Sequence, residues 1–228
     1  MQASTARTIE TQEKTVDRGR AGFLFVLGST LFLLLTTAAE AAYPNFSLLT
    51  NSISDLAAIG ARTMVIEEAA VLGLSICWLF GAYYLFRNTG RRGMMILNMA
   101  PGAGFLLAGL SPENFNLVLH SIGALVGFPL GAIAVIMSYK LIHTPLKYFS
   151  SALGALSLIA TFVTFAGQQI VGPCGACIGN SPGYVQSLDQ LILGLGGWES
   201  MIIFPFLVWL IAFGSYLLAS DNSKERPR

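Results

Sequence analysis

Charged residues are scarce in this chain of 228 residues, of which only 11% are Asp, Glu, Lys or Arg, against about 25% in soluble domains. The hydrophobic content of 54% and a mean hydropathy of +0.65 also exclude an ordinary soluble domain. Three Cys and two His are too few for a structural zinc site, a diheme bundle or a disulfide scaffold. A net charge of +1 gives no footprint for nucleic acid. The composition implies no cofactor, and membrane lipids are the expected partners.

The chain contains several long apolar windows. A bilayer core of about 30 Å needs roughly 20 largely apolar residues per helix. Six such windows occur, at about 21–39, 64–86, 94–110, 116–139, 148–171 and 198–219. They predict an all-α, six-helix transmembrane domain over 20–220, and polar, disordered tails at 1–19 and 221–228.

The basic residues are distributed asymmetrically between the connectors. Twelve of the 13 Lys and Arg lie in the two tails and in the second and fourth loops, whereas the first, third and fifth loops share only Arg62. Such a bias sets orientation in the membrane. It predicts a multi-pass protein of the cytoplasmic (plasma) membrane with both termini cytoplasmic. A cleaved signal peptide ending near 38–42 is the weaker alternative, because the apolar run is nearer a full span than the core of a signal peptide.

The first and fifth loops, on the outer face, contain amphipathic patterns. Apolar residues recur with a helical period over 48–59 and again over 185–195, with polar residues opposite them. These patterns predict two short interfacial helices that would roof the outer end of the bundle.

The fourth span carries Gly123, Gly127 and Gly131, spaced by four and therefore stacked on one helical face. Small residues allow close approach of another helix backbone. The stripe predicts intramolecular helix packing, with a dimer interface as the alternative.

Polar residues gather at the outer ends of the spans. Glu67 and Glu68 open the second span, His120 the fourth and Glu199 the sixth, and these four are candidates for acid–base catalysis. Asp55, Gln168 and Gln169 lie at similar depth and complete a predicted ligand pocket. The alternatives are binding of a cation or a headgroup, or an interhelical hydrogen-bond network with acids favoured by helix dipoles.

Cys174 and Cys177 form a Cys-x-x-Cys pair in the fifth loop. A disulfide that staples the loop is the main prediction, because membrane thiol–quinone enzymes use a second cysteine pair and the remaining Cys77 is alone. Redox catalysis, free thiols and a metal site shared with a partner remain alternatives.

Several short motifs carry a family resemblance over about 21–219. They are Tyr43-Pro44, the run from Asn51 to Leu56, Ser111-Pro112-Glu113 before His120, and Gly196-Gly197-Trp198-Glu199. The chain resembles prokaryotic membrane proteins of domain-of-unknown-function family nine-nine-eight, which are distantly similar to the Frag/DRAM/Sfk family. The resemblance implies six helices and no established activity or cofactor. Ser200 stands where that family usually has Arg, so no ion pair is carried over to this position, and the cysteine pair is not part of the family pattern.

The absence of a complete catalytic motif favours a non-enzymatic protein. The leading hypothesis is a module that binds a lipid or small molecule, or an accessory subunit with protein partners in a membrane complex. An acid–base enzyme acting on a lipid or isoprenoid is the alternative, followed by a thiol–quinone redox protein.

The charge bias makes a topology prediction. Reporter fusions after residue 228 and within 173–183 should report opposite sides of the membrane, because the basic tail is retained in the cytoplasm. The same side for both reporters would contradict six crossings.

Overall fold

The computed structural model describes residues 2–89, 92–170 and 193–222. Over these ranges the secondary structure is helical, which confirms the predicted all-α class. The elements are α1 (Gln2–Ala42), η1 (Ser54–Ala57), α2 (Met64–Thr89), α3 (Arg92–Gly109), α4 (Leu117–Met137), η2 (Ser138–Leu141), α5 (Leu146–Ile170) and α7 (Gly194–Asn222).

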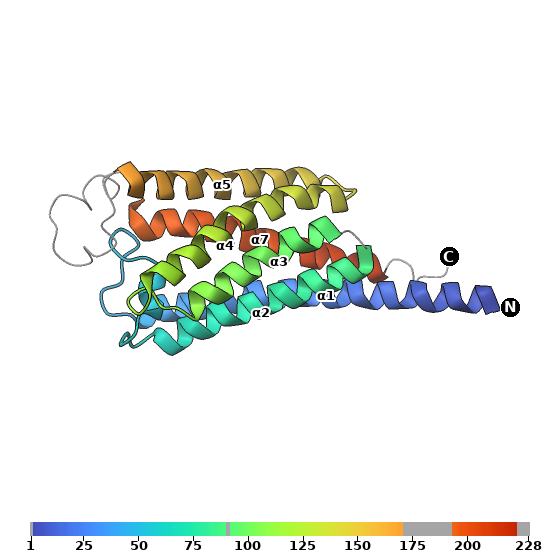
Figure 1. Cartoon of the computed structure of the whole chain (residues 1–228), viewed down its shortest axis with the longest axis horizontal. Helices are drawn as coiled ribbons and strands as arrows, with labels where there is room; N and C mark the ends of the chain where they lie inside the picture. Colours follow the sequence, from blue (N-terminus) through green and yellow to red (C-terminus); the bar gives the residue numbers. More distant parts are fainter. Residues whose placement is uncertain (1, 90–91, 171–192, 223–228) are drawn as a thin grey trace.

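The long helices lie side by side along one axis of the molecule (Figure 1). Each of the helices α1 to α4 packs against the next one in the chain, α5 packs against α7, and α7 packs back against α1, which closes a ring. Helix α7 also contacts α4 across the ring. In α7, 56% of the apolar stretch is buried in the bundle, against 33–44% in the other candidate spans. The last helix is therefore the most deeply buried of the candidate spans.

Five of the described helices are long and apolar enough to cross a bilayer. They cover Thr15–Ala42, Met64–Arg87, Leu117–Leu141, Leu146–Phe165 and Gly194–Ala219. Helix α3 is not one of the five, because Arg92, Asn98 and Pro101 lower the hydropathy of its 18 residues. It nevertheless packs between α2 and α4.

The N-terminus differs from the expected disordered tail, because α1 already begins at Gln2. Residues 2–18 contain no Gly or Pro and several good helix formers. A helix nucleated by the apolar span therefore extends through them. At 1.5 Å per residue the 41 residues of α1 measure roughly 60 Å, and the helix projects beyond the bundle (Figure 1).

The predicted amphipathic helix over 48–59 is wrong in extent, since only the four-residue η1 forms there. Side chains in this loop bond to backbone groups instead: Asn51 Oδ1 accepts from Ser47 N at 3.2 Å, and Asp55 Oδ2 accepts from Ser52 N at 2.9 Å. Such local bonds compete with helical hydrogen bonding. Of the second predicted helix, Leu195 belongs to α7, while 185–192 lie outside the described residues.

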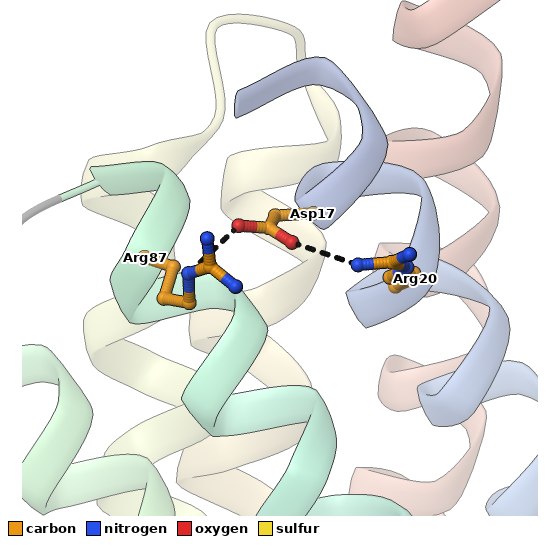
Figure 2. Close-up of polar contacts among 3 residues, drawn as sticks. All are labelled: Asp17, Arg20 and Arg87. Atoms are coloured by element: carbon orange, nitrogen blue, oxygen red, sulfur yellow. Dashed lines mark hydrogen bonds and ion pairs between the residues drawn. The ribbon is translucent and has the colours of Figure 1, made fainter. Parts of the chain in front are cut away.

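At the end of the bundle where the chain begins, an ion-pair cluster joins α1 to α2. The Asp17 side chain is buried and lies between two arginines (Figure 2). Arg87 Nε donates to Asp17 Oδ2 at 3.1 Å, and Arg20 lies 3.4 Å from Oδ1. The Arg20 guanidinium also lies over the Tyr84 ring, 5.4 Å from its centre. The cluster fixes the register of the two helices at this end.

The glycine face of α4 packs against α3. A Cβ built on Gly123 would lie 2.6 Å from Ala108 N and from Gly104 O, and one built on Gly104 would lie 2.5 Å from Gly127 N. These distances leave no room for a side chain. Gly131 has looser neighbours, with Trp78 at 3.6 Å. The stripe thus lies in an intramolecular contact between the two helices.

Substitution at this contact should destabilise the bundle. We expect Gly123→Ala to lower the free energy of unfolding by about 1–3 kcal/mol, because the added methyl group forces α3 and α4 apart. Thermal unfolding of the purified protein in detergent measures the change.

Gly73→Ala is the matched control. A Cβ at Gly73 has no neighbour within 4 Å, so this change should be neutral or stabilising by up to about 1 kcal/mol. Equal losses for both variants would contradict the packing argument.

Candidate functional site

A cavity of about 60 Å³ lies beside the loop around η1, at the end of the bundle where α2 and α4 begin. Five helices and the loop around η1 surround it, and most of its lining is apolar. The lining residues are Phe32, Ile53, Ser54, Ala57, Glu67, Val71, Leu74, Phe105, Ala108, Gly109, Pro112, His120, Ala124, Phe128, Glu199 and Ile203. Since a water molecule needs about 10–15 Å³ by this measure, the space admits about four waters or one small chemical group.

Glu67 supplies a fully buried carboxylate to this cavity. It lies in the first turn of α2 and is 0% exposed. Its Oε1 accepts a hydrogen bond from Thr36 Oγ1 of α1 at 3.1 Å. Its Oε2 is buried without a hydrogen-bond partner among the described residues. The neighbouring Glu68 is only partly buried and does not line the cavity, so Glu67 is the member of the pair that faces the bundle.

His120 lies in the first turn of α4, a helix capped by Asn116, whose Oδ1 accepts from Leu119 N at 3.1 Å. The imidazole Nδ1 is 3.2 Å from Ala108 O and 3.1 Å from Ser111 O. Carbonyl oxygens only accept hydrogen bonds, so Nδ1 must carry a proton and donate. In the neutral ring Nε2 is then an acceptor. The bonds tie α4 to the end of α3 and fix the tautomer.

Glu199 of α7 holds the first loop over the cavity. Its Oε2 accepts a hydrogen bond from Ile53 N at 2.5 Å, at the N-terminus of η1. A second contact between the same segments is the bond from Gly197 N to Leu48 O at 3.0 Å. A carboxylate at a helix N-terminus satisfies backbone N–H groups that the helix itself leaves unpaired. Glu199 is therefore both a cavity residue and the anchor of the loop.

The loop is also held by the turn between α3 and α4. Ser54 Oγ donates to Glu113 Oε2 at 2.9 Å. Asn114 bonds both backbone groups of Ile59, accepting from its N at 2.9 Å and donating to its O at 3.1 Å. Together with Glu199 these contacts connect the loop to two separate parts of the chain, the turn between α3 and α4 and the helix α7.

The predicted pocket residues have different positions in the structure. Glu67, His120 and Glu199 line one cavity, as described above. Asp55 does not line it, because its carboxylate bonds Ser52 N and the Asn51 side chain within the loop. Gln168 and Gln169 belong to α5, but their side chains lie outside what the structure describes, as do Cys174 and Cys177.

Three residues that matter to the site were not among the sequence candidates. Thr36 bonds Glu67, and Ser54 and Asn114 hold the loop. Thr36 has a weak sequence signal, since it is a polar residue in an apolar span at the depth of Glu67. Ser54 and Asn114 have none, because polar residues are ordinary in loops.

The chemistry available in the cavity is that of hydrogen-bond and proton acceptance. Among residues 2–89, 92–170 and 193–222, no group of three or more His, Cys, Asp or Glu could hold a metal ion. Two carboxyl groups and one imidazole face an otherwise apolar space. Such groups can bind a donor or transfer a proton.

Long apolar helices that pack side by side in a ring, with clusters of charged residues near its two ends, define a polytopic helical membrane protein. The chain belongs to the DUF998 family of proteins of unknown function, whose model matches residues 26–216. The matched range contains every residue of the cavity, whereas Asp17 and Arg20 precede it. No curated protein matches the chain, and no solved structure matches it.

The anchor residue yields a prediction. In Glu199→Ala we expect hydrogen exchange of the 53–57 backbone to become at least about tenfold faster, since hydrogen bonds to charged groups contribute about 1.5–3 kcal/mol. Exchange followed by mass spectrometry of peptides from this loop measures the change.

Two variants serve as controls. Glu199→Gln keeps an oxygen that can accept from Ile53 N, so its effect should be smaller. Glu68→Ala removes an acid from the same end of the bundle that has no described bond to the loop, and it should leave the exchange unchanged. Unaltered exchange in Glu199→Ala would show that the loop is held without this carboxylate.

Proposed function

We propose that all six long helices cross the plasma membrane and that both chain ends are cytoplasmic. At 1.5 Å per residue the 18 residues of α3 span about 27 Å, close to the thickness of the hydrocarbon core. The start of α1 and the end of α7 lie at the same end of the bundle (Figure 1), as an even number of crossings requires. The distribution of Lys and Arg supports the cytoplasmic assignment of that end.

We propose that the protein is a binding module for a lipid or another small amphipathic molecule, of which one small group enters the cavity. The observation that carries this proposal is the cavity, which combines aromatic walls from Phe32, Phe105 and Phe128 with polar groups near the loop. Ligand sites are typically apolar spaces with a few placed polar groups. The location at one end of the bundle also suits a ligand that enters from the interface of the bilayer.

The depth of the polar groups supports the same orientation for the ligand. Glu67 and His120 lie in the first turns of their helices, whereas Leu74 and Phe128 lie about two turns further in. Two turns correspond to roughly 11 Å. A ligand with a polar head and an apolar portion would match this gradient.

A second candidate is an acid–base enzyme acting on a lipid or isoprenoid. The specific observation in its favour is that His120, with Nε2 available as an acceptor, and Glu67 line the same cavity. A general base needs such an acceptor beside the substrate. This candidate uses the same cavity and would require turnover in addition to binding.

Filling the cavity tests the binding function. Ala124 lines the cavity, and we expect Ala124→Leu to reduce copurification of bound lipid or small molecule at least about tenfold, because the leucine occupies ligand space. The measurement is native mass spectrometry with extraction and identification of the bound molecules.

Ala103→Leu is the matched control, since Ala103 is exposed on α3 and the same change there leaves the cavity intact. Retention of the same ligands by both variants would contradict binding in this cavity. If Ala124→Leu abolished the release of a product rather than the retention of a bound ligand, the result would favour the enzyme.

A further inference from the structure

We infer that the ligand of this cavity presents a primary ammonium group to Glu67. The inference rests on the proposed binding function and specifies the chemistry of the ligand. It follows from counting which polar atoms around the cavity are already bonded and which are not.

The hydrogen-bond donors around the cavity are already used. The Thr36 hydroxyl donates to Glu67, and the Ser54 hydroxyl donates to Glu113. The Nδ1–H of His120 is directed at two backbone carbonyls. No Lys or Arg is among the residues that line the cavity. While Glu67 and Glu199 are ionised, a ligand therefore meets no free side-chain donor among the described residues that line the cavity.

Acceptors, in contrast, remain available. Glu67 Oε2 is buried and has no partner among the described residues, although its helix is well packed and the side chain is fully enclosed. Glu199 already accepts hydrogen bonds from the backbone of the loop, at Ile53 and Ser54. His120 has Nε2 as an acceptor in the tautomer that its neighbours impose. Buried polar atoms normally have a partner. Glu68 Oε2 also lacks one, but only Glu67 lines the cavity, so the unpartnered oxygen of Glu67 is the observation that points to a ligand there.

A primary ammonium complements this arrangement. It carries three N–H donors and no acceptor, so it can donate to Glu67 Oε2 and needs no donor from the cavity. Its positive charge offsets the buried carboxylates, whereas a phosphate or carboxylate placed directly against Glu67 would be repelled. A quaternary ammonium has the charge but no N–H, so it cannot form the bonds. The adjoining methylene groups would lie against the aromatic walls.

Two sources could supply this group: the headgroup of an aminophospholipid in the outer leaflet, or a small water-soluble amine. The test uses the purified full-length protein in detergent and native mass spectrometry. The lipids are phosphatidylethanolamine, phosphatidylcholine and phosphatidylglycerol with identical acyl chains. Ethylamine is added as a competitor to report the soluble source.

If the ammonium belongs to a headgroup, we expect phosphatidylethanolamine to bind at least tenfold more tightly than either of the other lipids. If it belongs to a soluble amine, we expect ethylamine to bind and to compete. Glu67→Gln should abolish the preference for the ammonium while keeping an oxygen for the Thr36 bond. Glu68→Gln, which changes the adjacent acid outside the cavity, should leave the preference unchanged. If ethylamine competes and Glu67→Gln abolishes the competition, the site binds a soluble amine. If ethylamine does not compete and phosphatidylethanolamine binds selectively, the site binds the lipid headgroup.

Equal binding of the three lipids at the cavity, without binding of ethylamine, would overturn the ammonium inference while the proposed binding function stands. Loss of selectivity in Glu68→Gln but not in Glu67→Gln would overturn it as well. If Ala124→Leu retained as much lipid as the unmodified protein, the proposed function itself would be overturned. The comparison of lipids on the unmodified protein decides the inference even where Glu67→Gln does not fold.

Discussion

The hydrogen bond from Ile53 N to Glu199 is the contact on which the closed end of the bundle depends. It joins residues 146 positions apart, and it places a charged group where the loop backbone would otherwise be unpaired. Without it the bond from Gly197 N to Leu48 O would be the remaining hydrogen bond described between this loop and α7. The same carboxylate therefore determines both the shape of the site and part of its charge.

Close packing on one side of the bundle and bulky packing on the other create the cavity. Gly104 and Gly123 let the α3 and α4 backbones touch, while the Trp78, Phe105 and Phe206 rings, with centres 5.7–5.8 Å apart, fill the ring interior. Next to these rings the small residues Ala108, Gly109 and Ala124 leave space, which Glu67 and His120 also line. The distribution of small and large residues thus separates a packed aromatic core from the cavity with its polar groups.

Hydropathy and spacing were enough to predict the helical class, five of the spans and the glycine face, because these depend on local composition. They could not predict the loop around η1, where Asn51 and Asp55 prefer bonds to the backbone over a helix. The similar depth of Glu67, His120 and Glu199 along their spans was enough to predict that they lie near one another. It could not exclude Asp55, because tertiary contacts decide which way a side chain in a loop points. The long α1 was missed because polar composition was taken as evidence of disorder.

The ring order of the helices has a consequence for biosynthesis. Most helices pack against their sequence neighbours, so each hairpin can form as it leaves the ribosome, but the anchor of the first loop lies in the last helix. At about 5–20 residues per second, the 146 residues between Ile53 and Glu199 take roughly 7–30 s to synthesise. During that interval the first loop lacks its hydrogen bond to Glu199, and Glu67 lacks the last of the helices that enclose it. Arrest of translation before α7 would leave a product that insertion machinery and proteases can distinguish from the finished protein.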